Sequence, residues 1–149
     1  MIDIKKLASS KIDFLDEVIS LSKEATEYIE SFPWCNKIIK GWLGKEWGYM
    51  FCVFYFEIDP KLNSNADKYV WAIVGDIPPA YIDIKSASNV SEAMEGYIFL
   101  MEDWIEHVRN NQPVTECYPI DVKPTREYAE MLYDRIQIIK EDFLSEVKE

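Results

Sequence analysis

The chain has 149 residues, of which 48% are hydrophobic and 14% aromatic, and its formal net charge is −11 at pH 7. This apolar content excludes a disordered chain, because burial of apolar surface can offset the entropy lost on ordering. The negative charge opposes binding to nucleic-acid backbones and anionic membranes, since both carry the same sign. We therefore expect one globular domain over residues 1–149, with neither nucleic-acid nor membrane partners.

The cysteines and the first residues bear on the cell compartment. The sequence has three cysteines, Cys35, Cys52 and Cys117. Their odd number and the absence of C-x-x-C spacing argue against a disulfide scaffold and against a zinc cluster. The opening stretch MIDIKKLASSKIDF has no apolar run of the signal-peptide type. We accordingly expect a cytoplasmic protein with reduced thiols, no metal and no cofactor.

The first predicted element is a helix over Lys11–Ser31, because its apolar residues recur mostly at intervals of three and four. Ser9 or Ser10 can cap its start, and Pro33 follows its end. A short second helix is expected within WCNKIIKGWLG, ended by Gly44.

Two strands are predicted next. The aromatic run Trp47–Ile58 has apolar residues at both odd and even positions, which is typical of an interior strand with both faces covered. Tyr69–Gly75 is the second strand, and the intervening loop suits an antiparallel hairpin. The stretch VGDIPPAYID follows, where Pro78 and Pro79 cannot donate to a ladder, so pairing can resume only at Ala80–Ile84 as a short edge strand.

Two helices complete the expected order. One spans Asn89–Asn111, capped by Asn89 or Ser91, and the other begins at Thr125. The apolar face of the last helix is expected to contain Tyr128, Met131, Leu132, Ile136, Ile139 and Phe143. The order α-(α)-β-β-(β)-α-α predicts an α+β fold, in which a small antiparallel sheet of two to four strands packs with about four helices.

No catalytic motif is found in the sequence. His107 is the single histidine, and a cation near a helix C-terminus is its ordinary explanation. Nucleotide-binding glycine motifs and histidine-pair zinc motifs are absent from the sequence. A pair of catalytic carboxylates stays an open alternative, because such pairs are defined by distance in space. We expect no enzymatic activity.

One helix face has an ordered pattern of acidic residues. Opposite the apolar stripe of the Asn89–Asn111 helix lie Glu92, Glu95, Phe99, Glu102, Asp103 and Glu106, a set called here the acidic face. An exposed Phe among carboxylates is typical of a binding surface for a basic protein. The alternative is a solvated helix face on which Phe99 packs under a neighbouring loop.

The stretch Gly75–Tyr81 and the opening of the last helix, Pro124–Glu127, carry a resemblance. The chain resembles a family of small uncharacterised bacterial proteins with a Gly-Asp-apolar-Pro-Pro-Ala-Tyr stretch after a Trp-containing strand. The resemblance implies an α+β fold and brings no catalytic residue with it. In size and acidity the chain is also similar to bacterial toxin-immunity proteins.

Three functional hypotheses follow. The first is a non-enzymatic immunity- or antitoxin-like inhibitor, whose acidic face occludes a basic toxin domain such as a nuclease. The second is a small-molecule-binding protein or enzyme with a pocket beside Gly75–Tyr81, formed by Trp71, Asp76 and Tyr81. The third is a homodimer that associates through apolar surface.

Overall fold

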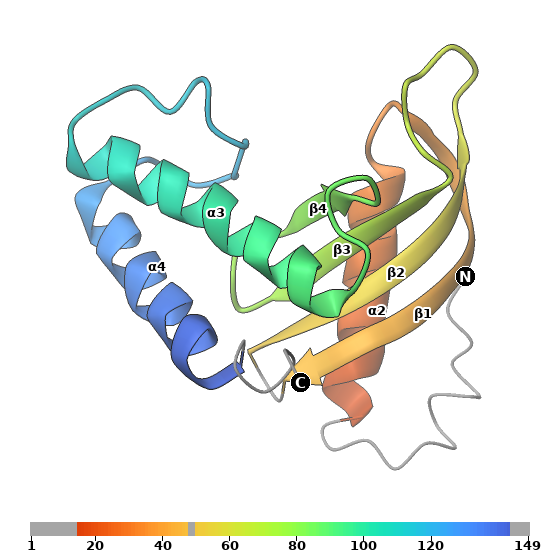
Figure 1. Ribbon diagram of the computed structural model, residues 1–149, viewed down its shortest axis with the longest axis horizontal. Coiled ribbons are helices and arrows are strands. Elements are labelled where there is room, and N and C mark those ends of the chain that lie inside the picture. Colours follow the sequence, from red (N-terminus) through yellow and green to blue (C-terminus); the bar gives the residue numbers. More distant parts are fainter. Residues whose placement is uncertain (1–14, 48–49, 144–149) are drawn as a thin grey trace. The chain divides into compact units, whose positions relative to one another are not determined.

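The computed structural model describes residues 15–47 and 50–143. Over these residues the chain is α+β, with one four-stranded antiparallel sheet, as expected. The elements in chain order are α2 (Leu15–Glu30), β1 (Cys35–Trp47), β2 (Phe51–Pro60), β3 (Tyr69–Gly75), β4 (Ala80–Asp83), α3 (Val90–Arg109), α4 (Arg126–Ile138) and the π-helical segment η1 (Ile139–Phe143) (Figure 1).

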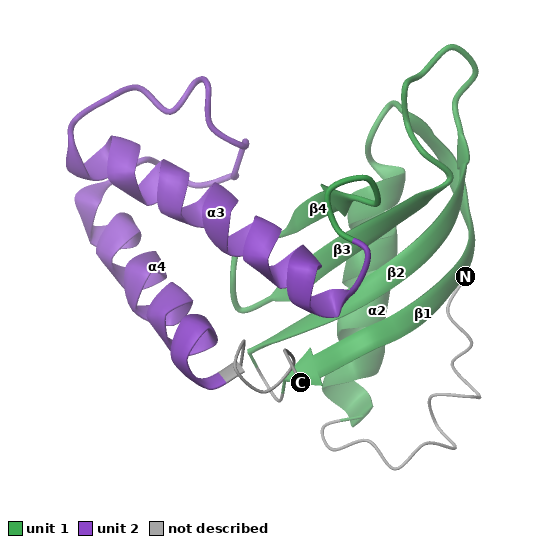
Figure 2. Cartoon of the chain, viewed as in Figure 1, with its two compact units in different colours: residues 1–87 green, residues 88–149 purple. Residues whose placement is uncertain are grey.

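The chain divides into two compact units, residues 1–87 and 88–149 (Figure 2). We call their described parts the sheet unit and the helical unit. The first holds α2 and the four strands, and the second holds α3, α4 and η1. The expectation of a single domain over residues 1–149 stays a prediction.

The strands follow one another across the sheet in the order β1-β2-β3-β4. The predicted strand Tyr69–Gly75 is confirmed residue for residue, and β2 is the expected interior strand between β1 and β3. The predicted start of that interior strand at Trp47 is wrong, because Trp47 ends β1 and β2 begins at Phe51. The expected short third strand is β4, which forms one edge of the sheet. Pro78 and Pro79 lie in the connection between β3 and β4, so the missing donors fall in a turn and the ladder resumes at Ala80.

The helix expected within WCNKIIKGWLG is wrong, because these residues belong to strand β1. The buried positions Cys35, Ile38 and Gly41 recur every third residue, a spacing close to that of a helix. Register shifts between Cys35 and Lys37 and between Ile38 and Lys40 explain the spacing. Each irregularity leaves one residue unpaired, so an alternation of two becomes an interval of three. Because of this strand, the described residues hold three α-helices where about four helices were expected.

The core of the sheet unit lies between α2 and one face of the sheet. Helix α2 buries Val18, Ser22, Ala25 and Ile29 at intervals of three and four. Val18, Ala25 and Ile29 pack in one apolar cluster with Cys52, Phe54, Phe56 and Ile58 of β2 and with Val70, Ala72 and Val74 of β3. Residues 11–14 of the predicted helix and its caps Ser9 and Ser10 lie outside the described residues, as do residues 48–49 of the predicted strand.

In the helical unit the expected caps are confirmed. The Asn89 side chain accepts a hydrogen bond from the Glu92 N–H at 2.8 Å, and Thr125 accepts one from the Tyr128 N–H at 3.2 Å. The apolar stripe of α3 is buried from Ala93 to Val108. On α4 the prediction for Met131 is wrong, because its side chain is exposed. The side chain of Phe143 lies outside the described residues.

Candidate functional site

Helix α3 positions every residue of the acidic face. Its buried stripe includes Met94, Tyr97, Met101 and Trp104, so the opposite side of the helix is left to polar residues. Phe99 is the exception, because its side chain is 70% exposed among carboxylates. The alternative in which Phe99 packs under a loop is therefore wrong. Burial of a Phe side chain contributes about 1.5–3 kcal/mol, and the fold leaves this free energy unused at Phe99.

Several carboxylates of the acidic face already have partners in the chain. Glu92 accepts hydrogen bonds from the Ser88 N–H at 2.9 Å and the Ser88 hydroxyl at 2.8 Å, and these bonds lower the pKa of Glu92. Glu102 pairs with Lys140 at 3.1 Å, and Glu106 accepts a hydrogen bond from the Asn110 side chain at 3.3 Å. Glu92 thus acts in the N-terminal cap. Glu95, Phe99 and Glu106 are exposed and lie at intervals of four and seven residues, which places them on one side of α3.

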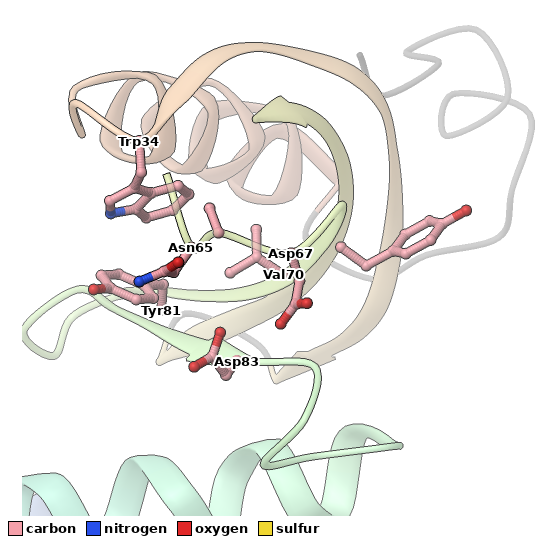
Figure 3. A pocket seen from close by; sticks show the side chains of 8 residues that line it. Trp34, Asn65, Asp67, Val70, Tyr81 and Asp83 are labelled. Atoms are coloured by element: carbon pink, nitrogen blue, oxygen red, sulfur yellow. The ribbon is translucent and has the colours of Figure 1, made fainter. Parts of the chain in front are cut away.

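A cavity of about 230 Å³ opens in the sheet unit (Figure 3). Its lining comes from the residue before β1, the loop before β3, and strands β3 and β4, and includes Trp34, Asn65, Asp67, Val70, Tyr81 and Asp83. The Trp34 and Tyr81 rings contact each other edge to face, with centroids 5.0 Å apart. Asp67 forms an ion pair with exposed Lys85 at 3.6 Å. Aromatic faces beside carboxylates suit an organic cation.

Of the three residues expected to form a pocket, Tyr81 lines this cavity and Trp71 and Asp76 do not. The sheet register explains the separation. Tyr81 pairs with Ala72, while Trp71 pairs with Ile82 and so lies on the other face of the sheet. There the Trp71 indole donates to the Ala87 carbonyl at 3.0 Å. Asp76 is exposed in the turn that precedes β4.

Sequence reasoning missed Trp34, Asp67 and Asp83 as cavity residues. Trp34 belongs to the segment that was expected to be helical. Asp67 lies in a loop whose sequence indicated only turns. An alternation argument could have placed Asp83 on the Tyr81 side of β4, because the two are separated by one residue.

Helix α3 and the loop after it bring together a second set of residues. A carboxylate oxygen of Asp103, a ring nitrogen of His107 and the sulfur of Cys117 lie within 4.8 Å of one another. Burial raises the pKa of the Cys117 thiol to about 11, with the hydrogen bond to Asp103 adding to the shift. Because the nucleophilic form of cysteine is the thiolate, this thiol is poorly suited to covalent catalysis at neutral pH.

Comparisons with known proteins provide no further assignment: no family model, curated protein or solved structure matches the chain. Within residues 15–47 and 50–143, none of the helices has the length and apolar character needed to cross a membrane.

Proposed function

We propose that the chain is a non-enzymatic protein-binding domain, and specifically an immunity- or antitoxin-like inhibitor that occludes a basic toxin domain such as a nuclease. The observation that carries this proposal is the exposed Phe99 among the carboxylates of α3. A central aromatic side chain supplies contact area that is removed from water on binding. The net charge of −11 attracts a basic partner from a distance and speeds the encounter.

The separation of buried and exposed residues on α3 supports the same proposal. The fold depends on the buried stripe and on the cap at Asn89, whereas Glu95, Phe99 and Glu106 are exposed and lie outside the hydrophobic core. A partner that covers Phe99 would bring its basic groups close to Glu95 and Glu106, because residues three, four and seven apart share one side of a helix. The toxin's active site would then be blocked by contact, with no chemical step.

The test requires a partner, which affinity capture from the native cell provides. The association rate of this partner is then measured at low salt with the double variant Glu95→Lys/Glu106→Lys. We expect a slowing of about ten- to a thousandfold, because steering depends on the charge at the contact surface. The matched control is Asp121→Lys/Asp134→Lys, which makes the same change in net charge at exposed positions off α3. Equal slowing in both variants would place the interface elsewhere.

Phe99→Ala supplies a separate readout. We expect faster dissociation of the complex and an affinity loss of about 2 kcal/mol or more if Phe99 is a central anchor. The inhibitory function is measured in the same experiment as loss of the partner's enzymatic or toxic activity on addition of the chain. A captured partner that is acidic, or whose activity the chain leaves unchanged, contradicts the proposal.

The alternative is a small-molecule-binding protein or enzyme that uses the cavity beside Tyr81. It is favoured by one observation, the combination of the Trp34 and Tyr81 rings with two carboxylates in the lining. Titration with a series of methylated ammonium compounds, followed by tryptophan fluorescence, tests it. The expected result is a saturable change that Tyr81→Ala abolishes and Trp42→Ala preserves, since Trp42 does not line the cavity. No saturable change in the wild type excludes this class of ligand.

A further inference from the structure

Asp103, His107 and Cys117 offer three metal-binding side chains of different chemistry at one place in the helical unit. Their oxygen, nitrogen and sulfur atoms all lie within 4.8 Å of one another. Asp103 and His107 are half-buried and Cys117 is buried, so the group is partly removed from water. The buried sulfur of Cys117 distinguishes this set from the groups of carboxylates elsewhere on α3.

The fold builds the cluster from one helix and the chain reversal after it. Asp103 and His107 are four residues apart, which places both on one side of α3 near its end. Past the end of the helix, Asn111 adopts a positive φ of 55° and the Gln112 N–H donates to the His107 carbonyl at 2.8 Å. A turn closed by the Cys117 N–H and the Val114 carbonyl, at 3.0 Å, then positions the sulfur (Figure 1 shows the loop after α3).

The imidazole of His107 is held by its own helix. Its Nδ1 lies 2.8 Å from the Asp103 backbone carbonyl and 3.5 Å from the Asp103 carboxylate. Contacts of this kind orient histidine rings at metal centres, where an outer partner restricts the ring's rotation. When Nδ1 donates to this carbonyl, Nε2 is the ring nitrogen that remains to coordinate a metal.

The donor set selects the class of metal. Thiolate and imidazole ligands suit Zn²⁺ and related transition metals, whereas Ca²⁺ and Mg²⁺ require six or more oxygen ligands. Ligand atoms at a tetrahedral zinc are about 3.3–3.8 Å apart, given bond lengths of about 2.0–2.3 Å. A set of atoms within 4.8 Å can reach this geometry by closing about 1 Å, which small side-chain rotations provide.

We propose that Asp103, His107 and Cys117 form a zinc-type transition-metal site, with three protein ligands and a fourth position open to water. On binding, the thiol proton leaves to solvent and the sulfur coordinates as thiolate. The site shares Asp103 with the acidic face, but Glu95, Phe99 and Glu106, on which the test of the inhibitor function depends, do not belong to it. In the helical unit the ion would link the loop that contains Cys117 to the end of α3.

The test is a titration of the reduced full-length chain with Co²⁺, a spectroscopic substitute for Zn²⁺. We expect one equivalent of Co²⁺ to produce a thiolate-to-cobalt charge-transfer band and the visible bands of a tetrahedral ion. Added Zn²⁺ is expected to remove both, and added Mg²⁺ is expected to leave both unchanged. No charge-transfer band at saturating Co²⁺ overturns the proposal.

Variants locate the site. We expect Cys117→Ser to lose the charge-transfer band and His107→Gln to weaken Co²⁺ binding by about a hundredfold or more, since changes beyond the ligands already cost about 10–100-fold. Cys35→Ser is the matched control, because Cys35 is another buried thiol and belongs to the sheet unit. A band that persists in Cys117→Ser, or that disappears in Cys35→Ser alone, overturns the assignment. His107→Gln keeps the test decisive if Cys117→Ser does not fold.

Discussion

Different kinds of contact stabilise the inside of the sheet unit and the inside of the helical unit. In the sheet unit one apolar cluster joins the side chains of α2 to those of the consecutive strands β2 and β3. In the helical unit α3 and α4 are also joined by charge: Arg109 forms two hydrogen bonds with Glu130, at 2.6 and 2.7 Å, and its guanidinium lies 4.2 Å from the Tyr133 ring centroid.

Because of this difference, we expect substitutions in the sheet unit to change mainly stability and substitutions on the exposed side of α3 to change mainly binding. A helix with one buried stripe leaves its other side free to carry charge and metal ligands, so the exposed residues of α3 can change with little effect on folding. In the sheet unit β2 has buried residues on both of its faces, including Phe51 and Val53 on one and Cys52 and Phe54 on the other. Substitutions there are expected to act on stability first.

The largest expected effect is that of Phe54→Ala. Phe54 is fully buried in the apolar cluster, so its truncation removes burial and leaves a cavity. We expect a loss of about 3–5 kcal/mol in the free energy of unfolding. Phe99→Ala is the same substitution at an exposed position of α3 and is expected to change stability by about 0.5 kcal/mol or less. Urea denaturation measures both, and similar losses would remove the contrast between the two regions.

Gly75→Ala is expected to rank second. Gly75 ends β3 with a positive φ of 146°, and an added Cβ would lie 2.3 Å from the Met50 carbonyl oxygen. The adjacent Asp76 N–H donates to the same carbonyl at 2.7 Å, so the backbone has little room to shift. We expect a destabilisation of about 1–3 kcal/mol, from backbone strain and from the clash. An unchanged denaturation midpoint would show that the turn rearranges without cost.

Loss of a helix cap in the helical unit is expected to cost less. Asn89→Ala removes the acceptor for the Glu92 N–H, for an expected loss of about 0.5–2 kcal/mol. Asn89→Asp is the matched control, because a carboxylate keeps the acceptor and suits the positive end of the helix. Thermal unfolding followed by circular dichroism distinguishes the two. A loss in Asn89→Asp as large as in Asn89→Ala would contradict a capping role.

The smallest expected effect concerns acid pH. The hydrogen bonds from Arg109 lower the pKa of Glu130 in the folded chain. A carboxyl whose pKa is lower when folded contributes stability above its unfolded pKa of about 4.3, and this contribution is lost as the pH falls through the folded value. Glu130→Gln is therefore expected to lower the denaturation midpoint slightly at pH 7 and to match the wild type in acid. If the difference in denaturation midpoint between Glu130→Gln and the wild type grows as the pH falls, the prediction is contradicted.

Residue patterns were sufficient where an element buries one face at a regular interval. The stripe of α3, the caps Asn89 and Thr125, and strand β3 were predicted because each signal is local. Strand β1 was misassigned because its register shifts space the buried residues like a helix. Met131 was misplaced because it shares a helical interval with buried residues but lies at the exposed margin of α4.

The candidate sites were predictable to different degrees. The acidic face follows from the sequence, since all of its members lie on one helix whose buried side is evident. Tyr81 was expected beside a pocket, but its neighbour Trp34 precedes β1 and comes from 47 positions earlier in the chain by numbering. Only the register of β3 with β4 places Trp71 on the other face of the sheet from Tyr81.

The sequence by itself determined the α+β class, the strong negative charge and the acidic face, because composition and periodicity are properties of the chain before it folds. The tertiary structure alone decided the nature of β1, the composition of the cavity and the meeting of Cys117 with Asp103 and His107. These features depend on strand register and on the turn after α3, which bring together residues that no single periodic pattern relates. Distances between such residues are set by packing and chain reversal, and they can be measured only after the chain has folded.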